Sequence, residues 1–135
     1  MGSELASALR STALEWRATD RRYTLEADGW RSFQPIQNQE GGDPVIVVVR
    51  LHADTAIPDS VSVLELQFVK DDVVWAPPHV SEVRREAGSS TMELVVRNGP
   101  GEWAPGDSVD VIARLRDGGA TSLVRAPRFV IARVD

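Results

Sequence analysis

The sequence predicts an all-β fold in which two antiparallel sheets pack against each other as a sandwich. About seven segments of strand length carry alternating or continuous apolar residues, and clusters of Gly, Pro, Asp and Asn separate them about every ten residues. No helical period appears after Asp20, which excludes repeated strand–helix–strand units. The length of 135 residues is that of one domain.

The N-terminal segment predicts a helix over Glu4 to Arg17. Its apolar residues recur at spacings of three and four, the period of one helical face: Leu5, Ala8, Leu9, Thr12, Ala13 and Trp16. An extended conformation from Trp16 through Leu25 is the competing interpretation, because these residues also suit an edge strand. Residues 28–44 are rich in Gly and Pro and predict a connection with one short strand near Phe33 to Gln37.

Residues 1–43 are therefore expected to form a helical or irregular segment that can include a first strand, and residues 44–135 the sandwich. Residues 45–51 are a β-branched run, which predicts a central strand covered on both faces. Residues 61–69 alternate as a half-buried strand does. The apolar face of this expected strand consists of Leu64, Leu66 and Phe68. Further short strands are expected at 73–75, 80–85 and 91–97.

The C-terminal third predicts a hairpin and a final strand. Residues 98–107 are dense in turn formers and predict a long loop. Residues 109–116 alternate as a strand, and Asp117-Gly118-Gly119 is a hairpin signal. The chain is then expected to return through Thr121 to Arg125 and, after a break at a proline, to end in a strand from Phe129 to Val134.

Charge and composition exclude several classes of partner. Fifteen Lys and Arg against twenty Asp and Glu give a net charge of -5, which disfavours nucleic acid and anionic lipid. Without cysteine the chain has no disulfides, thiolate metal sites or thiol nucleophiles. No stretch approaches the roughly 18 apolar residues that span a membrane, so membrane insertion is not expected. The compartment stays open, with a periplasmic or secreted location favoured over the cytoplasm.

A resemblance rests on residues 103–117. Trp103-Ala104-Pro105-Gly106-Asp107 leads into the alternating segment from Val109 to Leu115 and then into the hairpin. In this order, and in strand number and spacing, residues 44–134 resemble bacterial immunoglobulin-like and fibronectin type III-like domains. The resemblance implies an immunoglobulin-like sandwich and, by analogy, a role in recognition or spacing. The paired cysteines and the corner tyrosine of those families are absent, and Trp75 and Trp103 are expected to supply an aromatic core instead.

No catalytic, cofactor-binding or metal-binding residues are predicted, and we expect the chain not to be an enzyme. His52 and His79 have no ligand spacing with each other or with nearby aspartates. No serine lies in a nucleophile motif. Calcium binding by the acidic turns at 70–72 and 107–110 is the weaker interpretation, because Asp in turns is explained by local hydrogen bonds to the backbone.

Seven residues are candidates for an interaction surface: Trp75, Trp103, Arg114, Arg116, Leu5, Leu9 and Trp16. Arg114 and Arg116 share one face of their strand and, with Arg125 or Arg133 beside them, suit an anionic partner. The favoured interpretation is a solvated face on which these arginines pair with Asp110, Glu93 or Glu65. The three N-terminal residues are covered if the helix packs across an open end of the sandwich, and otherwise form an apolar stripe that seeks a partner.

The leading hypothesis is a non-catalytic protein-interaction or structural module, part of a bacterial extracytoplasmic protein or assembly, with a protein partner or self-association. The loops Asp71 to Pro78 and Asn98 to Gly106, at one end of the sandwich, are the expected binding surfaces. A second route is addition of a strand to an exposed sheet edge, or docking through the N-terminal segment. The alternative is a module that binds carbohydrate or a small molecule, or an enzyme accessory domain, through the loop tryptophans. The alternative requires Trp75 and Trp103 to be exposed side by side, whereas the leading hypothesis leaves at least one of them buried.

Overall fold

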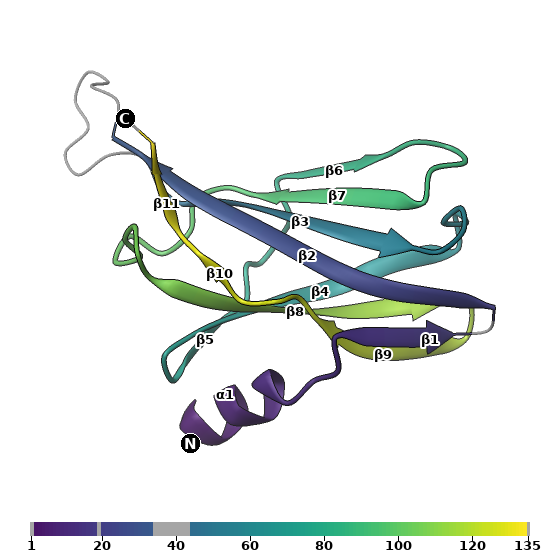
Figure 1. Cartoon of the computed structure of the whole chain (residues 1–135), viewed down its shortest axis with the longest axis horizontal. Coiled ribbons are helices and arrows are strands. Elements are labelled where there is room, and N and C mark those ends of the chain that lie inside the picture. The colour runs from purple at the N-terminus through teal and green to yellow at the C-terminus, as the bar shows by residue number, and fades with distance from the viewer. Residues whose placement is uncertain (1, 19, 34–43, 135) are drawn as a thin grey trace.

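The computed structural model describes residues 2–18, 20–33 and 44–134. It shows two sheets packed face to face as a β-sandwich, with one short helix at the N-terminus (Figure 1). The six-stranded sheet has the order β1 (Glu15–Ala18), β2 (Arg21–Ser32), β3 (Ile46–Ala53), β7 (Thr91–Val96), β6 (Glu82–Arg85), and β11 (Ala132–Val134) also pairs with β2. The five-stranded sheet has the order β10 (Phe129–Val130), β8 (Ser108–Asp117), β4 (Val61–Lys70), β5 (Val73–Trp75), and β9 (Ala120–Arg125) also pairs with β8. All pairings are antiparallel except that of β11 with β2.

The N-terminal helix, α1 (Gly2–Arg10), is shorter than the pattern predicts. The expectation that it reaches Arg17 is wrong, and the extended interpretation holds from Glu15 onward. In β1 and β2 the alternation of a strand directs Trp16 onto Tyr23, with 5.6 Å between the ring centroids, and buries Ala18. If the helix continued through these residues, Trp16 would not stack on Tyr23 and Ala18 would not be buried. Residues 15–18 and 21–32 are therefore strands of the six-stranded sheet.

The later strands confirm most of the expected pattern. In β3 both Val47 and Val48 are buried, as expected of a strand covered on both faces. In β4 the expected apolar face is wrong at one position: Leu66 and Phe68 enter the core, but Leu64 is 42% exposed. The cause is a shift of register between Val63 and Glu65, a bulge that turns Leu64 away from the core. The strand expected near Phe33 to Gln37 lies almost wholly outside the described residues.

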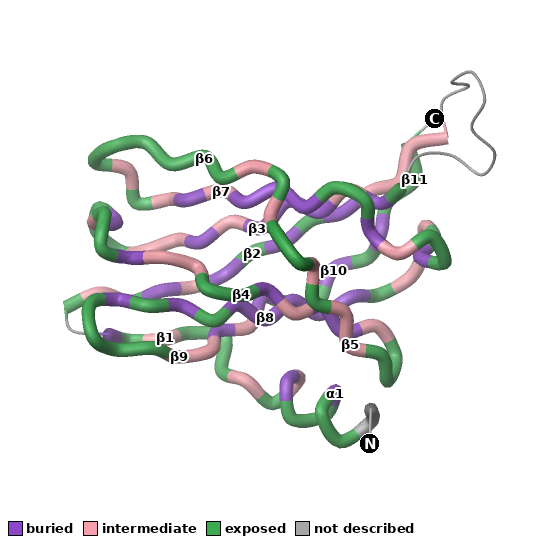
Figure 2. The backbone as a smooth tube through the Cα atoms, turned by 180° about the vertical axis from the view of Figure 1, so that it is seen from behind, coloured by how far each residue is buried: buried purple, intermediate pink, exposed green. Residues whose placement is uncertain are grey.

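The core lies between the two sheets. Buried residues gather along the central strands, whereas β6 and the loops are mostly exposed (Figure 2). The largest fully buried side chains between the sheets include Tyr23, Phe68, Leu51, Met92, Leu115 and Ile131. A polar contact crosses this core: the Tyr23 hydroxyl, from β2, donates a hydrogen bond of 2.8 Å to the buried Asp117 carboxylate at the end of β8, which also accepts from Arg21 at 3.3 Å. This bond joins the two sheets at a position where an unpaired carboxylate would cost free energy.

One side of the sandwich is closed by the C-terminal strand, which changes sheets. β10 pairs with β8, and β11 then pairs with β2 in the other sheet. Between them, Ile131 donates to the Asp107 carbonyl and accepts from the Gly106 amide, both at 2.9 Å. Gly29 in β2 makes room for Phe129, because a Cβ at Gly29 would lie 2.6 Å from the Phe129 ring. The crossing therefore depends on a residue without a side chain.

The opposite side of the sandwich is open. β5 pairs only with the last three residues of β4, from Phe68 to Lys70. Among the described residues, no strand therefore pairs with the outer side of β4 at positions 61–67, and none pairs with the side of β6 that faces away from β7. We call β6 and residues 61–67 of β4 the open edge. Unpaired strand edges are the usual sites of strand addition.

Tyr23 is the one tyrosine of the chain, so its ionisation can be followed by absorbance at 295 nm. Burial, together with the hydrogen bond to Asp117, raises the pKa of Tyr23 to about 12. Because the folded pKa lies above the unfolded value of 10.0, this group stabilises the fold fully below pH 10, and its contribution is lost as the pH rises toward 12. Asp117→Asn should lower the midpoint of the Tyr23 titration, because it removes the carboxylate that raises the pKa of Tyr23. A midpoint near 10 in protein that circular dichroism shows to be folded would contradict the buried Tyr23–Asp117 bond.

Candidate interaction surfaces

A groove of about 480 Å³ lies at the open edge, between β4 of one sheet and β6 of the other. Its floor includes the buried Leu66 and Leu94, and its rim includes Leu64 and Val83, which are 42% and 55% exposed. The other lining residues are Val63, Glu65, Pro77, Pro78, His79 and Val80. The lining is thus mainly apolar and reaches down to the core between the sheets.

Arg85 closes one end of this groove. From β6 its guanidinium donates to the carbonyls of Val61 and Pro58, both at 2.8 Å, and so joins the edges of the two sheets. A charged side chain turned inward in this way protects a free edge from unwanted pairing. At the other end, Pro77 and Pro78 belong to the connection between β5 and β6 and lack the amide hydrogens that strand pairing needs. The accessible part of the open edge lies between these two limits.

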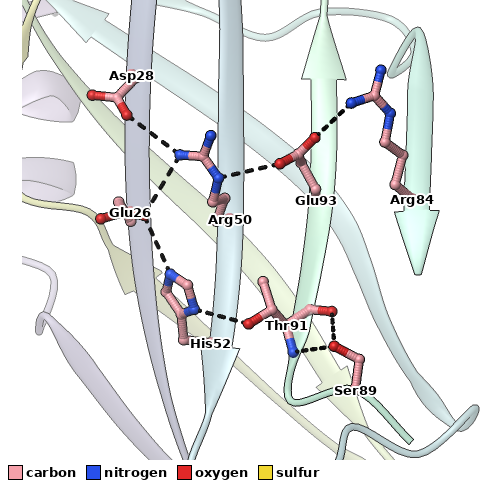
Figure 3. A network of polar contacts seen from close by, with 8 residues as sticks. All are labelled: Glu26, Asp28, Arg50, His52, Arg84, Ser89, Thr91 and Glu93. Carbon is pink, nitrogen blue, oxygen red and sulfur yellow. Dashed lines mark hydrogen bonds and ion pairs between the residues drawn. The ribbon is translucent and has the colours of Figure 1, made fainter. Parts of the chain in front are cut away.

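The outer face of the six-stranded sheet carries a ladder of paired charges (Figure 3). Arg50 of β3 donates to Glu93 at 3.2 Å and to Asp28 at 3.3 Å, and Glu93 also accepts from Arg84 at 2.9 Å. His52 lies beside these pairs, 3.1 Å from the Thr91 hydroxyl and 3.3 Å from a carboxylate of β2. These groups satisfy one another, so the face offers little uncompensated charge.

The ladder continues to the edge of the same sheet. Glu82 in β6 accepts hydrogen bonds from Arg97 at 2.7 Å and from Arg84 at 2.8 Å. These two hydrogen bonds hold the pKa of Glu82 below its ordinary value, so it stays ionised throughout the neutral range.

Helix α1 covers part of the outer face of the five-stranded sheet and lies beside β5 in Figure 1. Ala6 and Leu9 are buried there against the outward-facing side chains of Val69 and Ile112. Of the two alternatives left open by the sequence, neither describes α1 fully: it packs on a sheet face and not across an open end, and Leu5 remains 48% exposed. Apolar residues on the outer faces of β4 and β8 explain the position of α1, because these strands present apolar side chains on the outer face as well as on the core face.

A buried carboxylate anchors α1 to the sheet. Asp110 in β8 is 2% exposed and accepts hydrogen bonds from Arg10 at 2.8 Å and from Arg128 at 3.0 Å. Burial alone would raise the pKa of Asp110, but the hydrogen bonds from Arg128 and Arg10 outweigh it, and the pKa lies below its ordinary value. The linker after α1 is fixed too, since Arg125 donates to the Thr12 carbonyl at 2.9 Å.

Trp75, at the end of β5, and Trp103, in the loop before β8, lie together but are not equally accessible. Their ring centroids are 5.4 Å apart at an interplanar angle of 80°, and both rings approach Phe68. Trp103 is only 3% exposed, and Trp75 is half-buried. Arg31 holds the loop in place by donating to the Trp103 carbonyl at 2.6 Å. The cluster is thus an extension of the core with one partly accessible ring.

Arg114 and Arg116 are exposed on the outer face of the five-stranded sheet. In register they face Glu65 and Ser62 on β4, but the described residues offer neither of them a carboxylate within 4.0 Å. Arg133 does not extend these two arginines into a ladder, because β11 joins the other sheet. The pairing of these arginines with Asp110 is also not found, since Arg10 and Arg128 occupy that carboxylate.

The acidic turns use partners within the protein. Lys70 lies 3.2 Å from Asp71 and 3.7 Å from Asp107, which brings the two turns together around one ammonium group. Asp107 also accepts from the Ala104 amide at 2.9 Å. Within residues 2–18, 20–33 and 44–134, no group of three or more His, Asp or Glu side chains is arranged to hold a metal ion. In the same ranges no helix is long and apolar enough to span a membrane.

The groove was not found from the sequence. Leu64 looks like an ordinary core residue of an alternating strand, and only the bulge exposes it. The pair Pro77-Pro78 was the available signal, because two prolines after a short strand leave the neighbouring edge without a partner. No protein family model matches this sequence, and no curated protein is significantly similar to it.

The anchoring of α1 predicts a specific effect of Asp110→Asn. Because the folded pKa of Asp110 is depressed, its contribution to stability is complete above about pH 4, the unfolded value, and is lost as the pH falls through the folded pKa. We expect Asp110→Asn to lower the free energy of unfolding at pH 7 by about 1–3 kcal/mol, and the loss to shrink at pH 2–3. Urea unfolding at both pH values measures this. Asp72→Asn, at an exposed turn, is the control; an equal effect of both substitutions would contradict the anchoring role.

Proposed function

We propose that this chain is a non-catalytic protein-interaction module, a piece of a bacterial extracytoplasmic protein or assembly, that binds an extended segment of a partner protein at its open edge. The observation that carries the proposal is the apolar groove between β4 and β6 with two exposed apolar side chains on its rim, Leu64 and Val83. Covering apolar side chains such as these is worth about 1.5–3 kcal/mol each when burial is complete.

The rest of the surface supports this choice of site. The outer face of the six-stranded sheet carries the charge ladder around Arg50, and α1 covers apolar residues on the outer face of the other sheet. The side opposite the groove is closed by the crossing from β10 to β11. The open edge therefore combines apolar surface with unpaired strand backbone, the two properties that strand addition uses.

The unpaired backbone beside the groove favours an extended segment over a helix. The backbone groups of an α-helix are paired within the helix, so a helix gains no hydrogen bonds from the open edge. A strand is thinner and directs alternate side chains to one face, so two or three of them can enter the groove while the others remain outside. Leu66 and Leu94 would then form the base on which these side chains rest.

The order of the strands supports an immunoglobulin-like assignment. β2, β3, β7 and β6 follow the order of the four-stranded sheet of such domains, and β5, β4, β8 and β9 follow that of the other sheet. Domains of this type serve in recognition and as spacers, so the assignment agrees with an interaction role by analogy of fold. The alternative, a binder of carbohydrate or a small molecule through Trp75 and Trp103, has less support because Trp103 is buried.

Selection of random peptides by phage display against the full chain tests this function. We expect the selected peptides to bind Leu64→Asp at least tenfold more weakly than the parent chain, because a carboxylate on the rim opposes entry of apolar side chains. Val130→Asp is the matched control, because Val130 is 59% exposed on β10, on the closed side. Circular dichroism establishes that both variants are folded, and Val83→Asp provides a second groove variant.

The proposal fails if peptides bind the two groove variants and the control with equal affinity. It also fails if no peptide is selected while an oligosaccharide array gives binding that Trp75→Ala abolishes, which would favour the alternative function.

A further inference from the structure

The charges at the open edge specify what kind of segment it accepts. Over residues 58–67 and 81–86 the chain carries four carboxylates and two arginines, a local net charge of -2. Both arginines are engaged: Arg84 binds Glu82 and Glu93, and Arg85 binds the carbonyls of Val61 and Pro58. The basic groups of the open edge are therefore committed to contacts within the protein.

Three of the four carboxylates have no such contact. Asp59, Glu65 and Glu86 make no side-chain hydrogen bond or ion pair with any described residue, and all three are exposed. Asp59 follows Pro58 and Glu86 follows Arg85, so both lie at the end of the groove that Arg85 closes. Glu65 lines the groove itself.

The nearest charged groups of opposite sign do not cancel these carboxylates. Arg114 and Arg116 face Glu65 and Ser62 in register, but both lie one strand further in, on β8. Neither forms an ion pair with a described carboxylate, and neither lines the groove. His79 lines the groove from the connection between β5 and β6. The uncompensated charge along the rim is thus acidic, on a chain whose total charge is -5.

We propose that the segment bound at the open edge is an extended stretch of a partner protein in which apolar residues alternate with Lys or Arg. This inference rests on the proposed function. Successive side chains of a strand point to opposite faces, so the apolar residues enter the groove while the basic ones face the rim carboxylates. Opposite charges also accelerate encounter and oppose acidic competitors.

Fluorescence anisotropy with the full chain and three labelled eight-residue peptides tests the inference. The peptides alternate Val with Lys, with Ser or with Glu. We expect the Lys peptide to bind at least tenfold more tightly than the Ser peptide, and the Glu peptide to bind most weakly. Raising the salt concentration from 50 to 300 mM should weaken the Lys peptide most, because exposed charges are screened.

Charge variants distinguish the effect of the rim carboxylates on peptide binding from the effect of the total charge of the chain. Glu65→Gln with Glu86→Gln should weaken the Lys peptide several-fold and reduce its salt dependence. Glu4→Gln with Glu102→Gln is the matched control, because it removes the same two charges from exposed residues away from the groove. Equal loss in both double variants would mean that only the total charge acts, and would overturn the inference.

The remaining outcomes distinguish this inference from the function on which it rests. If the Ser and Lys peptides bind equally and the uncharged variant Leu64→Gln abolishes the binding of both, the inferred preference for basic residues is wrong and the groove remains the binding site. If the Lys peptide binds and Leu64→Gln has no effect, both proposals fail. Absence of binding by the Lys peptide up to millimolar concentration also overturns the inference.

Discussion

The crossing of the C-terminal strand from one sheet to the other is the constraint on which the rest of the structure depends. β10 completes the five-stranded sheet beside β8, and β11 extends the six-stranded sheet beside β2. The crossing is held by backbone bonds of Ile131 and by the close packing of Phe129 over Gly29. One side of the sandwich is thereby sealed covalently, and any surface that remains open must lie on the other side.

The opposite side lacks such a connection, and its two edges are joined by a side chain. Arg85 reaches from β6 to the carbonyls of Val61 and Pro58, which closes one end and leaves the groove beside it. Edge strands expose unpaired backbone, and proteins usually protect them with charges, prolines, bulges or a covering element. Here the protection is local, the adjoining rim is apolar, and three carboxylates along it, Asp59, Glu65 and Glu86, have no ion-pair partner among the described residues. These three properties together make the open edge a binding surface in our account.

Much of the fold was predictable from the sequence, because alternation, turn residues and the hairpin signal at Asp117 are local properties. The N-terminal segment was predicted less well: spacings of three and four suit a helix, but tertiary packing of Trp16 on Tyr23 selects a strand. The groove was not predictable, since it depends on a bulge at Leu64 and on a contact of Arg85 with a distant strand. Bulges and long-range contacts leave no periodic signal in the residues that form them.

Amide hydrogen exchange of the full chain, recorded with and without the alternating Lys–Val peptide, is the most direct measurement of the central claim. Strand addition at the open edge predicts slower exchange in residues 61–67 and 82–85, because amides there gain hydrogen-bond partners. The account predicts little change in β11 and in α1, which lie outside the groove. Slower exchange confined to α1 and the outer face beneath it, or none in β4 and β6 at saturating peptide, would contradict the account.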